Sequence, residues 1–325
     1  QNTSLSDPLG GAGTLFPPSI NSLDVYSRQP AVHSWNVTVQ RQLASDWTLE
    51  LGYVGTRGTH LPRTIQLNQA FYGPGNVNLR RPYLGYGSIT YNENAASSRY
   101  NALQTSLTRR FSKGLLVQLA YTWSKSLSDV EGTPLDSRNL RLDYGLADLD
   151  RTHVFNANYV WELPLFRRSH DWKTIAFRNW QVSGILTFQS GLPLNVTQSG
   201  DIAGFGGGAG AARPNQVGDP YAGSTGSVAH WFNTAAFVPV SLSGAVGTAP
   251  YNAVRGPGVS NLDTSLFREL KFSERWQTQI GIETFNTLNH AQFEGVSTNI
   301  SSANFGQITS ARDPRLIQLR AKISF

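Results

Sequence analysis

The chain has 325 residues, which is enough for one large all-β domain or two ordinary domains. It contains no cysteine, and this excludes disulfides, thiol catalysis and cysteine-ligated metal sites. The formal charge is +6, and the basic residues are dispersed as pairs such as Arg109–Arg110 instead of long tracts, so a nucleic-acid partner is not expected. Only 15% of the residues are charged while 11% are aromatic, which favours a sheet that meets lipid on one side.

The N-terminal stretch is polar and rich in turn residues, and no secretory signal sequence opens the chain. No apolar run reaches the roughly 18 to 20 residues of a transmembrane helix. A membrane-spanning form of this chain would therefore have to cross the bilayer as β-strands, whose alternating residues escape hydropathy windows.

A period-two alternation of apolar and polar residues begins with the first expected strand. Trp35, Val37 and Val39 share one side of it, while Asn36 and Thr38 take the other. The same alternation predicts about nine strands, in chain order over residues 35–43, 47–53, 103–111, 115–123, 155–163, 180–188, 262–272, 276–282 and 317–325. Their lengths suit the roughly 9 to 11 residues that a tilted strand needs to cross a bilayer.

The connections alternate between short and long. Tight turns are expected at Ala44–Asp46, Ser112–Gly114 and Ser273–Arg275, and a medium connection at 164–178. Long loops are expected at 56–99, 126–150, 191–257 and 289–313. Short turns on one side and long loops on the other are typical of outer-membrane barrels, with the short turns in the periplasm.

These features predict an all-β, antiparallel, up-and-down transmembrane β-barrel, of which the chain supplies about nine to eleven strands. Residues 1–33 are expected to form an extracellular loop or linker, and residues 34–325 the barrel segment. Nine is an odd number, whereas bacterial barrels have even counts, so we expect a fragment of a larger barrel. A further pair around Leu192–Gln198 and Trp231–Val240 would leave the count odd.

Aromatic residues are expected to form two girdles at the ends of the strands. One set, near the short turns, comprises Trp47, Phe111, Trp161, Trp180, Phe272, Trp276 and Phe325. The other set, near the long loops, comprises Trp35, Tyr53, Tyr100, Trp123 and Phe188. Amphipathic rings at both membrane interfaces are a property of such barrels.

Several segments resemble the barrels of TonB-dependent receptors, and most closely the Oar-like barrels that carry a carboxypeptidase-regulatory-like domain. They include WNVTVQRQLASDWTLELGYVGTRG at 35–58, YNALQTSLTRRFSKGLLVQLAYTWSKSL at 100–127, DLDRTHVFNANYVWELP at 148–164 and WQVSGILTFQSGLPLNV at 180–196. They continue with RGPGVSNLDTSLFREL at 255–270, IETFNTLNHAQF at 282–293 and the closing RLIQLRAKISF at 315–325.

This resemblance implies an outer-membrane receptor or transporter barrel of roughly 22 strands around a plug, of which this chain would supply the last part. It implies outer-membrane lipid as a partner, and the barrel-assembly machinery as the reader of the C-terminal strand. TonB would be contacted only by a part of the receptor that this chain does not supply. The resemblance identifies no ligand, cofactor or catalytic residue.

Two clusters of residues could suggest other chemistry. Asp148, Asp150 and His153 could form a metal or hydrolytic site, but they lie where a long loop enters a strand, and such residues face water. The acidic loop with Asp129, Glu131, Asp136 and Asp143 could hold Ca²⁺, although its spacing is not that of an EF-hand.

Two further patterns bear on enzymatic chemistry. The run Gly204–Gly210 lacks the lysine and the βαβ context of a phosphate-binding loop, so a mobile loop tip is expected. No G-x-S-x-G occurs, and no catalytic, cofactor or metal residue is assigned. Two alternatives to a transporter stay open: an outer-membrane adhesion or scaffold protein that works through its loops, and a soluble β-rich binding module.

Overall fold

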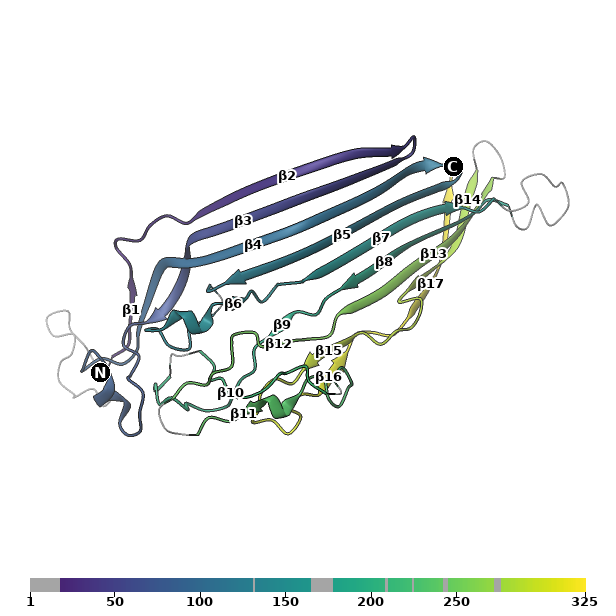
Figure 1. Cartoon of the computed structure of the whole chain (residues 1–325). Helices are drawn as coiled ribbons and strands as arrows, with labels where there is room; N and C mark the ends of the chain where they lie inside the picture. The colour runs from purple at the N-terminus through teal and green to yellow at the C-terminus, as the bar shows by residue number, and fades with distance from the viewer. Residues whose placement is uncertain are drawn as a thin grey trace.

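The computed structural model describes residues 18–130, 132–164, 178–207, 210–223, 225–241, 245–271 and 276–325. Nine long strands form one antiparallel wall in the order β17-β14-β13-β8-β7-β5-β4-β3-β2 (Figure 1). They are β2 (Ala31–Ala44), β3 (Trp47–Gln66), β4 (Ile89–Ser112), β5 (Leu115–Ser128), β7 (His153–Glu162), β8 (Trp180–Gln189), β13 (Val259–Lys271), β14 (Gln277–Phe285) and β17 (Leu316–Ser324). The expected count of about nine long strands is thus confirmed.

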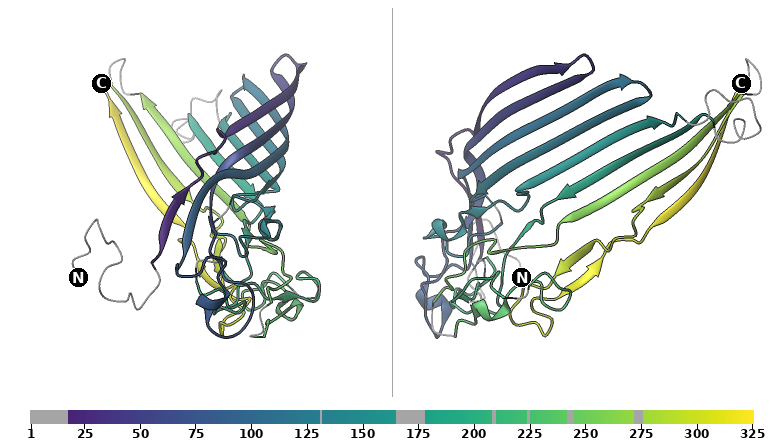
Figure 2. Two further views of the ribbon diagram at one scale, coloured as in Figure 1. Left: turned by 90° about the vertical axis from the view of Figure 1, so that its left-hand side faces the viewer. Right: turned by 45° about the vertical axis from the view of Figure 1, so that its right-hand side comes forward.

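Two short strands complete an eleven-stranded sheet: β1 (Ile20–Leu23) pairs in parallel with β4, and β6 (Gly145–Leu146) pairs with β5. The wall is strongly curved, so that β14 and β17 face the strands at the other end of the sheet across an open trough (Figure 2). Among the described strands, β2 pairs with β3 alone and β17 with β14 alone. Both ends of the sheet therefore present backbone groups that can pair with a further strand.

The short connections have the geometry that tight hairpins require. Lys113 and Gly114 join β4 to β5, and both have positive φ, 53° and 80°. Two successive positive φ angles define the type I′ turn, whose twist matches that of the two strands that it joins. Ser45 and Asp46 connect β2 to β3 in two residues, without a positive φ at either.

The strands of the first hairpins are longer than the sequence predicts. Residues 56–66 and 89–99, expected as part of a loop, continue β3 and β4 as paired strands, so that the connecting loop is confined to 67–88. The ladder shifts register between Gly58 and Pro62, where the strands pass the end of the regular wall. The expectation failed because the residues beyond Gly58 no longer alternate in hydrophobicity, although their backbones still pair.

Beyond the wall, the long connections fold together at one end of the molecule. We call the described residues of 67–88, 129–152, 190–258 and 286–315 the loop cap. Besides β6, its strands are β9 (Pro193–Leu194), β10 (Asn215–Gln216), β11 (Phe237–Val238), β12 (Val254–Arg255), β15 (Phe293–Val296) and β16 (Ile308–Ala311). Its 3-10 turns are η1 (Val77–Arg80), η2 (Leu140–Asp143) and η3 (Thr234–Ala236).

The loop cap has a hydrophobic core of its own. Phe232, 1% exposed, packs edge-on against Phe237 and Phe305 with ring centroids 5.9 and 5.3 Å away. Val196 and Val254 are fully buried in the same cluster. The further strand pair considered within 191–257 is therefore wrong: residues 193–194 pair with 254–255, and 215–216 pair with 237–238, as two short ladders outside the wall.

The described helical segments are all single 3-10 turns of three or four residues. None of the helices in the described part of the chain is long and apolar enough to cross a membrane.

Candidate functional site

The register of the wall places most of the apolar residues of the nine strands on one face. One row across the sheet runs Leu49, Leu107, Leu119, Ala157, Leu186 and Leu262, each directly opposite the next. The next row runs Val39, Leu51, Thr105, Tyr121, Phe155 and Phe188. Side chains alternate between the faces of a strand, so these rows form one continuous apolar surface, which we call the apolar face.

The opposite surface, the polar face, carries amides, hydroxyls and charges. One of its rows runs Gln40, Glu50, Ser106, Ala120, Asn156, Thr187 and Asn261. The Thr187 hydroxyl donates to the Asn156 side-chain oxygen at 3.1 Å. Arg320 and Glu283, also on this face, form an ion pair at 3.3 Å. This is the face that can meet water or a polar solute inside a barrel.

Aromatic side chains mark both ends of the apolar face. At the turn end, the ring centroids of Trp276 and Phe325 are 5.3 Å apart. At the loop end, Trp35, Tyr53 and Trp123 are 43%, 42% and 56% exposed. Tyr100 does not join them, because it lies opposite Thr56 and Ser126, on the polar face. Phe272, expected in the turn-end girdle, lies outside the described residues.

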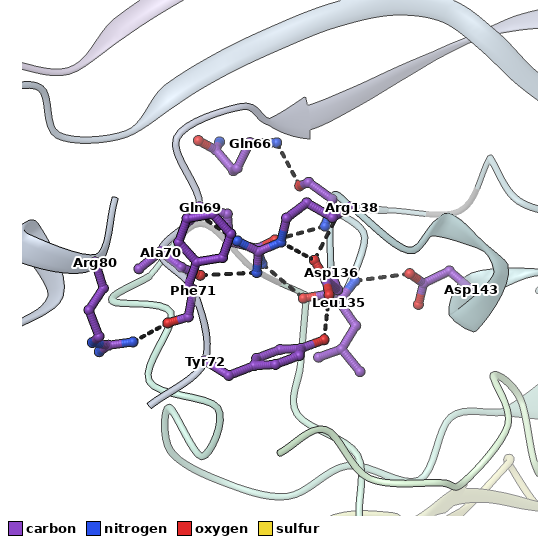
Figure 3. A network of polar contacts seen from close by, with 11 residues as sticks. Gln66, Gln69, Ala70, Phe71, Tyr72, Arg80, Leu135, Asp136, Arg138 and Asp143 are labelled. Atoms are coloured by element: carbon purple, nitrogen blue, oxygen red, sulfur yellow. Dashed lines mark hydrogen bonds and ion pairs between the residues drawn. The ribbon is translucent and has the colours of Figure 1, made fainter. Parts of the chain in front are cut away.

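In the loop cap, Arg138 organises a network of polar contacts (Figure 3). Its guanidinium donates to the carbonyl oxygens of Gln69 and Ala70 at 3.1 Å and to Asp136 at 3.2 Å, and it lies 4.7 Å from the centre of the Phe71 ring. The connection between β3 and β4 is thereby tied to the connection after β5. A cation stacked on an aromatic ring and bonded to carbonyl groups holds both segments in one arrangement.

The Tyr72 hydroxyl donates to Asp136 in the same network. Burial, together with this hydrogen bond to a carboxylate, raises the pKa of Tyr72 to about 12. Both causes favour the neutral phenol, since a phenolate would stand beside the negative charge of Asp136.

A buried ion pair lies next to this network. Arg213 donates to Asp143 at 3.1 Å and to the Leu142 carbonyl oxygen at 2.8 Å, and its side chain is 1% exposed. Burial raises the pKa of Asp143 and lowers the pKa of Arg213. Desolvation therefore outweighs the mutual attraction of the two charges, so burying the pair costs free energy. The pair connects two cap segments that are 70 residues apart in the chain.

A second buried carboxylate attaches the cap to the wall. Asp150, 1% exposed, accepts the backbone N–H of Ser126 at the end of β5 and pairs with Arg255 of β12 at 2.5 Å. The same guanidinium reaches the Gly191 carbonyl oxygen at 3.0 Å. The two ends of the long connection from 191 to 257 thus meet at the Arg255 guanidinium, which Asp150 holds.

The residues considered for metal binding or catalysis do not converge. His153 bonds through Nδ1 to the Tyr121 hydroxyl at 2.8 Å, while Asp148 accepts from Tyr251 and Asn252. Asp129 pairs with Arg63 at 3.2 Å. Glu131 lies outside the described residues. Within the described ranges, no three metal-ligating side chains come together.

The glycine-rich run does not form a free loop tip over its described residues 204–207. Phe205 is 1% exposed and its ring centroid lies 5.1 Å from that of Tyr72. Gly204 and Gly206 have φ of 70° and 75°, and a Cβ at either position would meet other cap atoms at 2.4 and 2.2 Å. These glycines therefore allow the chain to turn tightly and bring Phe205 into the cap.

One cavity of about 350 Å³ lies within the cap. Leu135, Asp201, Phe205, Ala212, Arg213 and Gly247 line it, with other small residues. Sequence reasoning did not find it, nor the Arg138 network, because the residues come from connections more than 60 positions apart. No periodic pattern signals such long-range contacts.

The sequence profile described as outer membrane beta barrel domain matches residues 2–318. The chain belongs to this family, and its location is the outer membrane. An outer-membrane barrel domain excludes the soluble β-rich module as an alternative.

No curated protein sequence matches the chain. Among solved structures, it is similar to the outer membrane transporter YddB from Escherichia coli, with 9% identity and a TM-score of 0.47. It is also similar to the ferric-catecholate import receptor Fiu from Escherichia coli K12 (10%, 0.43) and to the FrpB iron transporter from Neisseria meningitidis (8%, 0.44). The similarity covers 92%, 93% and 94% of this chain but only 33%, 28% and 32% of those chains.

Proposed function

We propose that the chain forms part of the wall and the extracellular loops of a TonB-dependent receptor of the Oar-like group, which binds or imports a polar ligand. The observation that carries the proposal is the pairing of a continuous polar face with a folded loop cap at one end of it. A barrel that only anchored a surface protein would not need a cavity in its cap.

The orientation follows from the connections. The short turns would lie in the periplasm, and the loop cap would face the outside of the cell. The apolar face would contact lipid, and the polar face would line the lumen. Energy coupling through TonB would involve a segment other than the residues described here, and the free edges of β2 and β17 would pair with further strands, because unpaired backbone groups in lipid cost several kcal/mol each.

The ligand class is proposed from the lumen side chains. Glutamine, asparagine, serine and threonine hydrogen-bond neutral polar groups, so oligosaccharides and short peptides suit the wall better than apolar compounds. No catalytic role is proposed for any residue. The C-terminal strand β17, which ends beside Phe325, would be the segment that the barrel-assembly machinery binds.

Depletion of solutes from the medium tests the proposal. Cells with and without the full-length gene would be incubated with a defined mixture of short peptides and oligosaccharides, with and without an uncoupler of the proton-motive force. We expect at least one solute to disappear only in energised cells that carry the gene. If no solute is depleted but attachment of the cells to surfaces depends on the gene, the protein is an adhesion or scaffold protein that works through its loop cap.

A further inference from the structure

Four basic residues gather on the apolar face, next to its loop end. His33 of β2 lies directly opposite Arg57 of β3, and Arg57 lies directly opposite Arg99 of β4. Lys125 of β5 lies opposite Asn101, one step along the same face from Arg99. We call His33, Arg57, Arg99 and Lys125 the basic cluster; all four are exposed.

The ladders around the basic cluster fix the direction of its side chains. The β2–β3, β3–β4 and β4–β5 pairings run without a register shift from these residues into the apolar rows. Each basic residue is an even number of positions from Val37, Tyr53, Leu103 or Trp123 on its own strand. Since side chains alternate, the cluster points to the same side as the apolar residues, away from the polar face.

The aromatic residues give the depth of the cluster. Trp35, Tyr53 and Trp123 form the loop-end girdle, and such rings lie at the level of the lipid head groups. Arg57 and Arg99 lie four residues beyond Tyr53 and Leu103, a rise of about 13 Å along the strands before their tilt is considered. His33, Arg57 and Arg99 therefore lie on the water side of the girdle, where lipid phosphates are located, and Lys125 lies in the row of Trp35.

The charges of the basic cluster are not neutralised within the described part of the chain. Like charges placed directly opposite on neighbouring strands are destabilising, yet Arg57 faces Arg99 and neither makes an ion pair there. Asp129, four residues after Lys125 in the chain, is already paired with Arg63. At the turn end, by contrast, Arg109 pairs with Asp46 at 3.0 Å.

We propose that the basic cluster binds the phosphate groups of an anionic lipid in the outer leaflet. Two guanidinium groups on neighbouring strands can each make bidentate contacts with phosphate oxygens, and the ammonium of Lys125 adds a third charge.

Binding of diphosphoryl lipid A to the full-length protein tests this proposal. The protein would be extracted from outer membranes, delipidated in detergent and titrated with lipid A in mixed micelles, and the bound lipid counted by native mass spectrometry. We expect R57Q/R99Q to weaken binding at least roughly tenfold, because each lost charge-assisted contact is worth about a factor of ten. R57K/R99K, which keeps the charges, should retain more of the binding than R57Q/R99Q.

Arg41 provides the matched control, since it is exposed on the apolar face near the turn end and opposite Leu49. R41Q removes one charge from the same face and should bind lipid A as the unsubstituted protein does. Equal binding by R57Q/R99Q and the unsubstituted protein, or an equal loss in R41Q, would overturn the proposal. Inorganic phosphate competing at the same concentration as lipid A would show an anion site without lipid, which also overturns it.

The proposal depends on the orientation given under the proposed function but not on transport. Cells that carry R57Q/R99Q should still deplete the solute that the receptor imports, because the polar face is unchanged. A protein that binds lipid A but depletes no solute would leave the lipid site in place and remove the transport proposal alone.

Discussion

The indole ring of Trp35 lies across Gly55, its direct cross-strand neighbour. A Cβ built on Gly55 would stand 2.3 Å from the Cε2 and Nε1 atoms of that ring. Because Gly55 has no side chain, the Trp35 ring can pack on β3 between Tyr53 and Arg57. This contact fixes one member of the loop-end girdle at the border between the apolar face and the basic cluster.

Gly55→Ala is therefore expected to displace Trp35 and to lower the free energy of unfolding by about 1 to 3 kcal/mol, the usual cost of overpacking. Gly52→Ala is the control, because the nearest atom to its Cβ would be Thr38 Oγ1, at 3.3 Å. Urea unfolding of the full-length protein in liposomes, followed by tryptophan emission, measures both. Equal midpoints for the two variants would mean that the ring does not depend on Gly55.

Leu119 and Ala120 test the two faces with neighbouring residues. Leu119 lies in the apolar row between Leu107 and Ala157, while Ala120 lies in the polar row between Ser106 and Asn156. Leu119→Arg is expected to cost roughly 2 to 4 kcal/mol near the membrane centre. Ala120→Arg should cost much less, since its side chain would enter the lumen. Folding yield in liposomes compares them, and a greater loss for Ala120→Arg would reverse the assignment of the faces.

Much of the wall could be predicted from the sequence because each strand carries its own alternation. The apolar sets beginning at Trp35, Leu103 and Phe155 were predicted strand by strand, and the ladders bring them onto one face. Residues 56–66 were missed because Gly58, His60 and Pro62 interrupt the pattern, while their backbones pair with the beginning of β4.

The loop cap could not be predicted because its contacts join distant segments. Nothing near Arg138 in the sequence indicates Gln69 or Ala70, and nothing near Arg213 indicates Asp143. Asp129 and Asp143 suggested a calcium site because the arginines that pair with them, Arg63 and Arg213, lie elsewhere in the chain. The basic cluster was hidden for the same reason, since His33, Arg57 and Arg99 meet only through the register of three strands.

Removing one partner of the Arg213–Asp143 pair should destabilise the loop cap more than replacing both partners. Arg213→Ala leaves a buried carboxylate without its cation, which is expected to cost roughly 3 to 5 kcal/mol of cap stability. Replacing both residues, as Asp143→Asn with Arg213→Met, keeps an acceptor for the Leu135 N–H, which Asp143 accepts at 3.0 Å. The double variant should recover most of the loss.

Hydrogen exchange of the amides in η2 and its flanking residues measures the opening free energy of this part of the cap. The single variants Arg213→Met and Asp143→Asn, measured beside the double variant, complete a double-mutant cycle. A double variant that opens as easily as Arg213→Ala would show that the ion pair itself stabilises the cap, contrary to the balance argued from the pKa shifts of both partners.

Tyr72 should make the cap sensitive to alkali. Its pKa is raised from 10.0 to about 12 in the folded cap, so the folded state favours the neutral phenol. The stabilisation linked to this group is fully present below pH 10 and is lost as the pH rises through about 12. The difference in phenolate absorbance between the unsubstituted protein and Tyr72→Phe isolates one of the 12 tyrosines. A midpoint near 10 would show that the hydroxyl is not bonded to Asp136.

The central claim is that the nine strands form a membrane wall with lipid on the apolar face and water on the polar face. These 325 residues contain no cysteine, so a single cysteine placed among them has no competing thiol within this part of the protein. The most direct measurement is labelling by a membrane-impermeant maleimide of cysteines at Leu107, Leu119, Ser106 and Gln118, in the full-length protein in outer membranes. The account predicts labelling at positions 106 and 118 and protection at 107 and 119. Uniform labelling, or the opposite alternation, would contradict it.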